Sequence, residues 1–488
     1  MLECLLNIVM SSPPVKPTQL KRGAVGFWHA VYQSISYMSP AGDVAILLTA
    51  TAAFALGAMP LSLIIAWLIY ALWLIVPYLF SQEIVNAGSY YAYSVRASGF
   101  LGILTLWYWM TDNWTCAAGF GALGLATVLY YINPAFYHIP YLWVAFAFIV
   151  PTWGFIMSYL GIKPSLAYAM YTGFAEIFYI IIASIIIIAM VLPHLSASTA
   201  VAPFTPIPVK GAWSLIFFGT VFSILDFVGL GTATTISEEV ENPKKTIKRA
   251  LYIAWALGGI TLILASYALT VGWGVFNMSS FATSPDPGFI VFYKYLGPVG
   301  WALLLAFVLN SYLAYGVAKW NSISRLWFSA ARDGLWFKYI HAEKVHPKYR
   351  TPYVALIWYY GSVLVLALVT GFLLGPFNGS VFLLTIDGLG MIATHIVVNT
   401  ALTYYKYKSV GLRGKDVLFY LLYVIAPVVA SITAFVVFFY SVYPLPSYPF
   451  NIAVLIAIGW FLVGFIIAWW YSKYHAELLK HAGASYEL

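Results

Sequence analysis

Residues 36–43 read Ser-Tyr-Met-Ser-Pro-Ala-Gly-Asp and lie in the middle of a long apolar run, residues 26–56. A proline inside a helix costs about 3 kcal/mol, and a glycine costs about 1 kcal/mol relative to alanine. An aspartate at the centre of a membrane helix costs about 2.5–3.5 kcal/mol on insertion scales. Because Pro40, Gly42 and Asp43 stand together, the stretch predicts an interrupted helix. A simple proline kink, satisfied by a neighbouring helix, is the alternative.

The interruption divides the run into two half-helices. The first is expected to stop near Tyr37, and the second to begin at Pro40 with Ser39 as its N-cap. The free amides of residues 41–43 would then point into the membrane midplane, with the positive end of a half-helix behind them. Since non-helical backbone at that depth must be buried or line a cavity, the stretch predicts a midplane binding site.

The composition around this stretch is that of a polytopic membrane protein. Of the 488 residues, 62% are hydrophobic and only 8% are charged, whereas soluble domains carry about 25% charged residues. The net charge of +8 is attributed to cytoplasmic loops rather than to nucleic-acid binding. Cys4 and Cys116 are too few for a disulfide framework or a zinc site. Without a phosphate-loop motif, an ATP-driven pump is not encoded, and no cofactor is expected beyond H⁺ or Na⁺ as a coupling ion.

Twelve segments are apolar and long enough to cross a hydrocarbon core of about 30 Å. Lys and Arg concentrate on the side of the N-terminus, which predicts that both termini are cytoplasmic in a multi-pass plasma-membrane protein. The fold class is therefore all-α. The expected spans are 24–55, 58–83, 99–131, 139–160, 164–193, 212–236, 249–276, 292–324, 352–375, 379–405, 416–440 and 449–472.

A second interruption is predicted in the sixth span, where residues 217–240 read FFGTVFSILDFVGLGTATTISEEV. Asp226, Gly229 and Gly231 fall near its middle. Two interrupted helices, five spans apart, indicate a transporter built from inverted repeats. The residues suited to capping the restart are Thr232, Thr234 and Thr235.

Four further segments carry a family resemblance. SEEVENPKKTIKRAL (237–251), NAGSYYAYSVRASG (86–99), RLWFSAARDGLW (325–336) and HPKYRTPYVAL (346–356) resemble the amino acid–polyamine–organocation transporters. The resemblance implies alternating access without ATP by two inverted five-helix repeats and two extra helices. The implied divisions are a cytoplasmic tail 1–23, a first repeat 24–193, an extracellular loop 194–211, a second repeat 212–405, a cytoplasmic loop 406–415, helices 416–472 and a cytoplasmic tail 473–488.

The sequence departs from that family at the predicted site. Many members carry Gly-x-Gly-Ile-Phe in helix one, where this chain has residues 40–43. Many carry Phe-x-Gly-x-Glu in helix six, where residues 227–231 keep the Phe and the first Gly but lack the Glu. Some proton-coupled members place a Lys in helix five, where this chain has Glu176.

These features predict a secondary transporter that binds an amino acid in a bilayer-embedded site. The substrate carboxylate is expected at the amides of residues 41–43, and its ammonium at backbone carbonyls of residues 36–37 and 223–226. Glu176 and Asp43 are the candidates for ion coupling. The predicted substrate-binding residues are Tyr37, Ser39, Ala41, Gly42, Asp43, Trp114, Asp226, Phe227 and Gly229.

Three rival functions stay open at this level. A polyamine or another organic cation would suit the carboxylates at the two breaks and would not need the amides. A channel would need a continuous polar pore, whereas the polar residues cluster at the midplane and the ends. A membrane enzyme would need a catalytic or metal-ligand motif, which the sequence does not present. The other ionisable groups inside spans, open to structural or functional roles, are Asp112, Lys319 and Asp387.

Overall fold

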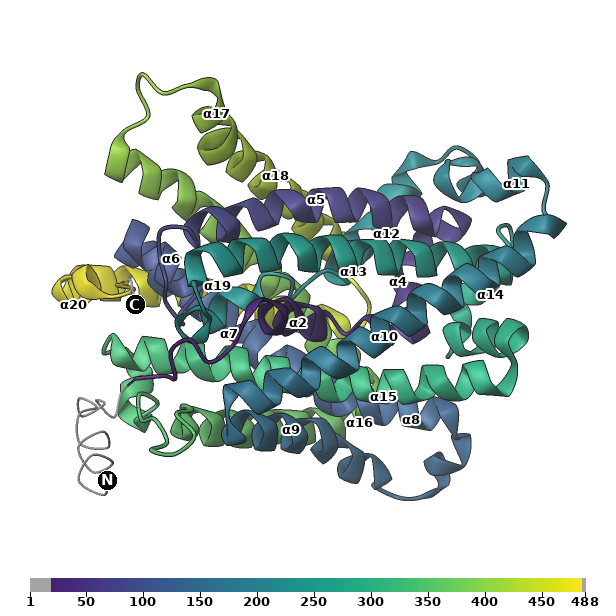
Figure 1. Cartoon of the computed structure of the whole chain (residues 1–488), viewed down its shortest axis with the longest axis horizontal. Coiled ribbons are helices and arrows are strands. Elements are labelled where there is room, and N and C mark those ends of the chain that lie inside the picture. The colour runs from purple at the N-terminus through teal and green to yellow at the C-terminus, as the bar shows by residue number, and fades with distance from the viewer. Residues whose placement is uncertain (1–18, 485–488) are drawn as a thin grey trace, which may run out of the picture.

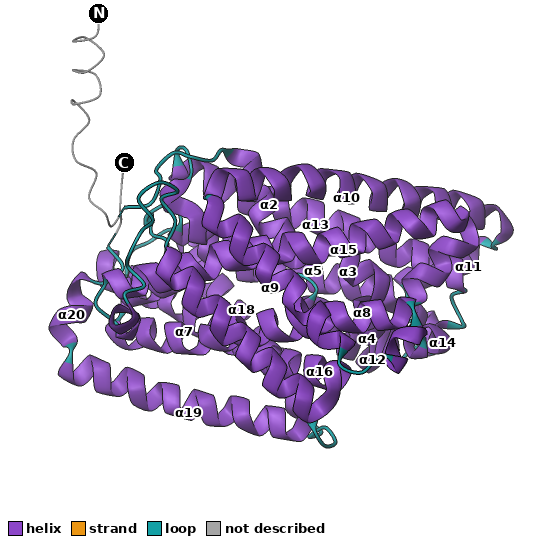
Figure 2. Ribbon diagram, turned by 90° about the horizontal axis from the view of Figure 1, so that it is seen from below, coloured by secondary structure: helices purple, strands orange, loops and turns teal. Residues whose placement is uncertain are grey.

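The computed structural model describes residues 19–484, and these residues form a bundle of helices (Figures 1 and 2). Within that range the one β interaction is an isolated parallel bridge between Val25 and Val240. Among the described residues, nine helical segments are long and apolar enough to cross a membrane. The all-helical expectation is therefore confirmed for the described residues.

The helices of the first half follow the predicted spans closely. They are α2 (Phe27–Met38), α3 (Pro40–Gly42), α4 (Leu48–Ala55), α5 (Met59–Phe80), α6 (Tyr90–Ala97), α7 (Gly99–Thr111), α8 (Leu125–Ile132), α9 (Leu142–Leu160) and α10 (Ile162–Val191). A π-helical stretch, η3 (Asp112–Gly124), joins α7 to α8. The loop expected at 194–211 contains the short helix α11 (Ala197–Val201) and two 3₁₀ turns.

The second half continues in the same way. Its helices are α12 (Trp213–Leu225), α13 (Pro243–Trp273), α14 (Met278–Thr283), α15 (Pro287–Arg332), α16 (Tyr353–Val410), α17 (Val417–Tyr420), α18 (Ala426–Val442), α19 (Phe450–Tyr474) and α20 (Ala476–His481). Two of them bend at a glycine followed by a proline. Gly297 in α15 has φ 67° and Gly375 in α16 has φ 78°, a region that side-chain-bearing residues rarely adopt. α16 is therefore two helices, as the predicted spans 352–375 and 379–405 require.

The first helix is interrupted where the sequence predicts. α2 ends at Met38, Ser39 adopts the left-handed conformation (φ 59°, ψ 61°), and α3 begins at Pro40. A π-helical turn, η1 (Asp43–Leu47), leads on into α4. Ser39 is the N-cap residue and Pro40 begins the helix, as expected. The Ser39 side chain makes no capping hydrogen bond, and its hydroxyl pairs with the Ser311 hydroxyl at 2.9 Å instead.

The sixth span is also interrupted, since α12 ends at Leu225 and the chain resumes as the 3₁₀ helix η8 (Thr232–Glu239). The expectation that threonines cap this restart is wrong. The hydroxyls of Thr232, Thr234 and Thr235 donate back to carbonyls three residues earlier, at 2.6–2.7 Å. A 3₁₀ segment leaves such carbonyls accessible, because its hydrogen bonds are poorly aligned.

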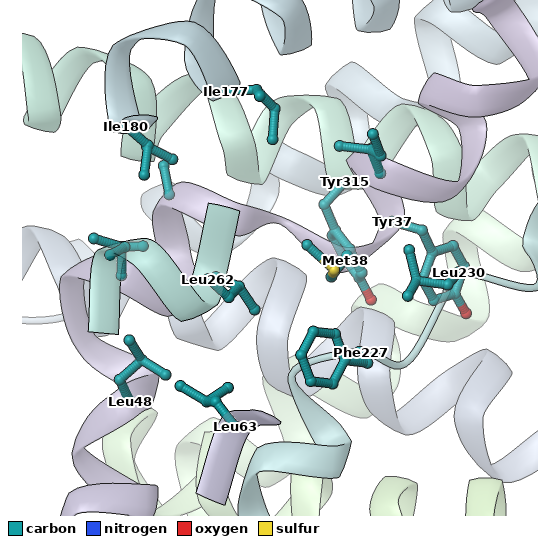
Figure 3. Close-up of a cluster of buried hydrophobic side chains, with 14 of the residues drawn as sticks. Tyr37, Met38, Leu48, Leu63, Ile177, Ile180, Phe227, Leu230, Leu262 and Tyr315 are labelled. Atoms are coloured by element: carbon teal, nitrogen blue, oxygen red, sulfur yellow. The ribbon is translucent and has the colours of Figure 1, made fainter. Parts of the chain in front are cut away.

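The two interruptions pack against each other in the core. Figure 3 shows Tyr37 and Met38, at the end of α2, beside Phe227 and Leu230 from the second break. A methyl group on Gly229, which has φ 105°, would lie 2.3 Å from the Tyr37 ring, so only glycine permits this approach. The two interruptions are therefore in direct contact with each other.

The first and last described residues lie at the same end of the bundle (Figure 1). Leu20 packs with Ala87, and Asn86 donates to the Ala484 carbonyl at 2.7 Å. Two ion pairs join the end of η8 to α15. The Arg325–Glu239 pair is 2.8 Å long and fully buried, and the Arg332–Glu238 pair is 2.7 Å long.

Candidate functional site

A carboxylate of the protein lies at the start of the restarted first helix. Glu176 of α10 accepts the Ala41 amide hydrogen through Oε1 at 2.9 Å, and the Ser311 hydroxyl at 2.8 Å. The amides of Gly42 and Asp43 donate to the Ser39 carbonyl at 3.0 and 3.3 Å. The expectation of free amides at residues 41–43 is therefore wrong, since a helix N-terminus attracts an anion and Glu176 supplies one.

A cavity of about 170 Å³ lies beside this turn, between the two broken helices, η3, α15 and α16. Three carboxylates line it: Asp43, Asp226 and Asp387. The polar part of the wall also includes Tyr37, Tyr315 and the Cys116 thiol. The remainder of the wall is apolar and consists of Met38, Leu47, Ala50, Phe120, Phe222, Leu225, Val228, Leu384, Gly388 and Met391.

Each of the three cavity carboxylates has a buried oxygen that no described residue hydrogen-bonds. These oxygens are Asp43 Oδ2, Asp226 Oδ2 and Asp387 Oδ1. Leaving one buried polar atom unsatisfied costs about 1–3 kcal/mol, and more where the group is charged. Buried polar groups in native proteins therefore almost always have a partner. The cavity thus presents three acceptor oxygens that a hydrogen-bond donor inside it could reach.

A fourth buried carboxylate near the cavity is already neutralised. The Lys319 ammonium lies 2.9 Å from Asp112 Oδ1, with both side chains fully buried. Tyr37 donates to Asp112 Oδ2 at 2.8 Å, and the Lys319 ammonium donates to the Tyr37 oxygen. This closed set joins α2, η3 and α15. It fixes the ring of Tyr37 at the cavity wall.

Asp112, Cys116 and Asp387 bring ligand atoms within 4.8 Å of one another, a spacing that a metal ion could use. The donors present fit a metal poorly. Asp112 is held by Lys319, and the Cys116 sulfur accepts the Tyr315 hydroxyl at 3.0 Å. The Lys319 ammonium already supplies the positive charge beside Asp112, while Cys116 and Asp387 line the cavity.

The predicted site residues divide into three groups. Tyr37, Asp43 and Asp226 line the cavity. Ser39, Ala41 and Gly42 form the turn beside it and take part in the contacts to Glu176, Ser311 and Phe120. Phe227, Gly229 and Trp114 lie outside the wall.

The last of these groups has other contacts. Phe227 is fully buried against Tyr70, and Gly229 backs onto the Tyr37 ring. The Trp114 indole donates to Ser362 at 3.0 Å, so this side chain is not an aromatic wall of the cavity.

Sequence reasoning left several wall residues out of the predicted site. Asp387 was identifiable as an intramembrane charge, but its distance from both breaks along the chain hid its place in the cavity. Phe120, Tyr315 and Cys116 carried no local signal, because aromatic and small residues are frequent throughout the spans. Only the packing of η3, α15 and α16 around the breaks assembles them.

Relatives of this chain are found among proteins of known activity. It is 27% identical over 150 residues to the low-affinity putrescine importer PlaP of Escherichia coli, covering 31% of this chain and 32% of that protein. It is 23% identical over 340 residues to the branched-chain amino acid permease BcaP of Bacillus subtilis, covering 66% of this chain and 62% of that protein. The chain thus spans under two thirds of the length of either relative.

Among solved structures, a manganese transporter of Eremococcus coleocola aligns with 96% of this chain and 100% of its own, at 13% identity and a TM-score of 0.49. The profile of the amino acid permease family matches residues 29–481, which include both broken helices and the cavity. The chain therefore belongs to the amino acid permease family.

Proposed function

We propose that this chain is a secondary transporter whose substrate binds in the cavity between the two broken helices. Twelve spans in a five-plus-five inverted repeat, with both termini cytoplasmic at the plasma membrane, are the organisation we infer for it. Family membership and the paired interruptions at one depth of the bundle support this inference.

We further infer that the substrate is recognised chiefly by amino groups, and that a short aliphatic diamine fits best. The observation that carries this inference is the set of unpartnered oxygens on Asp43, Asp226 and Asp387 around one small cavity. Two ammonium groups satisfy two of these carboxylates, and the apolar wall covers a methylene chain. At about 170 Å³ the cavity is smaller than the roughly 300–1,000 Å³ pockets of drug-sized ligands, which suits a small molecule.

An amino acid is the second candidate, favoured by the family and by the likeness to the permease BcaP. Its α-ammonium would meet the same aspartates. Its carboxylate would need the Ala41 amide, which Glu176 occupies. The likeness to the putrescine importer PlaP agrees with the diamine. The geometry thus favours amines, whereas the sequence alone favours amino acids.

Glu176 is the residue that we assign to ion coupling. Its carboxylate touches the restarted helix through Ala41 and α15 through Ser311, so a proton on Glu176 weakens both contacts at once. Loosening these contacts would free the half-helix to move relative to α10 and α15. Alternating access requires such a two-state element.

Matched ligand pairs test the substrate class. Cadaverine is lysine without its carboxylate, and putrescine is ornithine without its carboxylate, so each pair isolates the contribution of one group. We expect both diamines to stabilise the purified protein against heat at lower concentrations than their amino acids. A ligand at 100 times its Kd stabilises by about 2.7 kcal/mol. Stabilisation by lysine and leucine but not by cadaverine would establish the amino acid instead.

The location of the site has its own test, because Cys116 lines the cavity. In a Cys4→Ser background, a small thiol reagent should label Cys116, and a bound diamine should slow that labelling. Labelling that is unchanged at saturating diamine would move the site elsewhere. Saturable uptake into proteoliposomes, accelerated by substrate on the opposite side, separates a carrier from a channel.

A further inference from the structure

A large hollow on the described part of the protein lies away from the substrate cavity, between α5 and α13 with the start of α2 at one end. It encloses about 800 Å³. Apolar side chains of both helices line most of its length, including Ile75 of α5 and Leu251 of α13. Tyr252 on its rim is 61% exposed, so the groove opens on the lipid-facing surface of the bundle rather than into the core.

The two ends of this groove differ in chemistry. At one end the groove is lined by Trp255, which stacks on Trp67 at 4.2 Å. Each of these two indoles donates to the other residue's carbonyl at 3.0 Å. At the opposite end, Lys248, Arg249 and Tyr78 line the groove. α13 begins at Pro243, three residues after Val240, which pairs with Val25, so this end lies on the side of the bundle where the first described residues lie. The groove is therefore apolar inside and cationic at the level of one membrane surface.

The two cations have no anionic partner among the described residues: no ion pair or hydrogen bond joins Lys248 or Arg249 to a carboxylate of residues 19–484. Lys248 and Arg249 lie in the first two turns of α13, which begins at Pro243, and so they lie near the end of the helix. From Lys248 to Trp255 the helix rises about 10 Å, the depth of the upper part of an acyl chain.

We propose that this groove binds one anionic phospholipid of the leaflet on the side of residues 19 and 484. The phosphate lies between Lys248 and Arg249, near the Tyr78 hydroxyl, and an acyl chain runs along α5 and α13 down to the Trp67–Trp255 pair. Charge complementarity selects the anionic headgroup, since a basic residue near an anionic surface contributes about 1 kcal/mol. Aromatic rings such as Tyr78 favour the headgroup level.

Through Phe27, a lipid in this groove can influence transport. Phe27 is the first residue of α2, the half-helix that ends at the break, and it lines the groove. A lipid in the groove packs against the end of the element that borders the substrate cavity through Tyr37 and Met38. Occupancy of the groove therefore biases the position of α2.

Native mass spectrometry of the full chain tests the proposal. Palmitoyl-oleoyl phosphatidylglycerol is compared with the phosphatidylcholine of the same chains, and the expected result is stronger retention of the phosphatidylglycerol. The variant Lys248→Gln/Arg249→Gln should lose this preference by about 30-fold, from about 1 kcal/mol for each cation. Arg413→Gln/Lys415→Gln removes the same number of positive charges from the loop between α16 and α17, and this variant should retain the preference for phosphatidylglycerol.

A second variant tests the apolar part of the groove. Ala71 lines it and is half-buried, so Ala71→Trp fills the groove and should abolish retention of both lipids. Leu68→Trp changes an exposed position of the same helix outside the groove and should leave retention intact. Equal retention of the two lipids by the parent, or an unchanged preference in Lys248→Gln/Arg249→Gln, overturns the proposal.

Discussion

Glu176 holds the amide of Ala41 at 2.9 Å, so a carboxylate of the protein lies at the N-terminal end of the half-helix that begins at Pro40. The same oxygen accepts the Ser311 hydroxyl at 2.8 Å, and Ser311 pairs with Ser39. One side chain thus connects α10, the break and α15. Any motion of the half-helix away from α10 must break the Ala41 contact.

The first prediction concerns this contact. Glu176→Gln keeps an oxygen that accepts from Ala41 and Ser311 but cannot gain or lose a proton. If protonation of Glu176 loosens the half-helix, the variant should take up substrate with a flattened dependence on pH while still binding it. Uptake into proteoliposomes across a pH series measures this. A parent and a variant that are driven equally by Na⁺ alone, with identical pH profiles, would make the role of Glu176 structural.

The second prediction concerns Gly42. A methyl group there would lie 3.1 Å from the Ser39 hydroxyl and 3.4 Å from the Phe120 ring, which lines the cavity. Gly42→Ala should therefore displace the Ser39 hydroxyl and narrow the turn beside the cavity. Overpacking of this kind costs about 1–3 kcal/mol, and if that cost falls on the bound state it corresponds to a loss of affinity of about 5-fold to about 150-fold.

Binding isotherms with a diamine measure this effect. Gly26→Ala is the matched control, because a methyl group at Gly26 meets nothing within 4 Å. Gly42→Leu enlarges the same clash and should abolish binding. Unaltered affinity in both Gly42 variants would place the substrate away from this turn.

The sequence was sufficient to locate both interruptions, because proline, glycine and aspartate each carry a known cost inside a membrane helix. It was not sufficient to identify what satisfies them. The partner of the Ala41 amide is 135 residues away, and only the packing of α10 against α2 brings Glu176 there. Asp387 likewise reaches the cavity only through tertiary packing, in its case the packing of α16 against η3. The prediction that Trp114 lines the substrate site was wrong. The sequence near Asp112 has no feature that distinguishes an aromatic residue of a cavity wall from one that packs between helices.

The third prediction concerns the buried pair of Lys319 and Asp112. Lys319→Met leaves the Asp112 carboxylate in the core without its cation. Removing one partner of a buried pair destabilises a protein by about 3–5 kcal/mol. Thermal unfolding in detergent should show this loss, and Lys319→Met/Asp112→Asn should recover most of it. A double variant no more stable than the single one would mean that Lys319 contributes by packing alone.

The fourth prediction concerns Asp333, which follows the membrane-spanning part of α15. Its Oδ2 accepts the Gly483 amide and the Tyr91 hydroxyl at 2.9 Å, and so ties the C-terminal segment to α6. Burial raises the pKa of the Asp333 carboxyl above its ordinary 3.8, although these hydrogen bonds oppose the shift. Because the pKa of Asp333 is higher in the folded state than its ordinary 3.8, the protonated carboxyl stabilises the fold. This contribution is fully present below pH 3.8 and is lost as the pH rises through the folded-state pKa of Asp333.

Asp333→Asn should therefore stabilise the protein at neutral pH, and this gain should shrink as the pH falls toward 3.8. Thermal unfolding at several pH values measures the difference. Glu241→Gln, at an exposed position, should show no such trend. A gain that does not vary with pH would show that ionisation of Asp333 is not its source.

The last prediction returns to the aspartates of the two breaks. Asp43 and Asp226 face one cavity, each with a buried oxygen that lacks a partner among the described residues. Asparagine keeps the shape and removes the charge, so Asp43→Asn or Asp226→Asn should weaken diamine binding strongly. Truncating one side of a buried charge pair costs about 2–5 kcal/mol, which is about 30-fold or more in affinity. Competition between cadaverine and lysine in each variant measures the loss. If Asp43→Asn matches the parent in affinity, pH response and ion response, Asp43 serves only the first turn of its helix, where a negative charge is favoured.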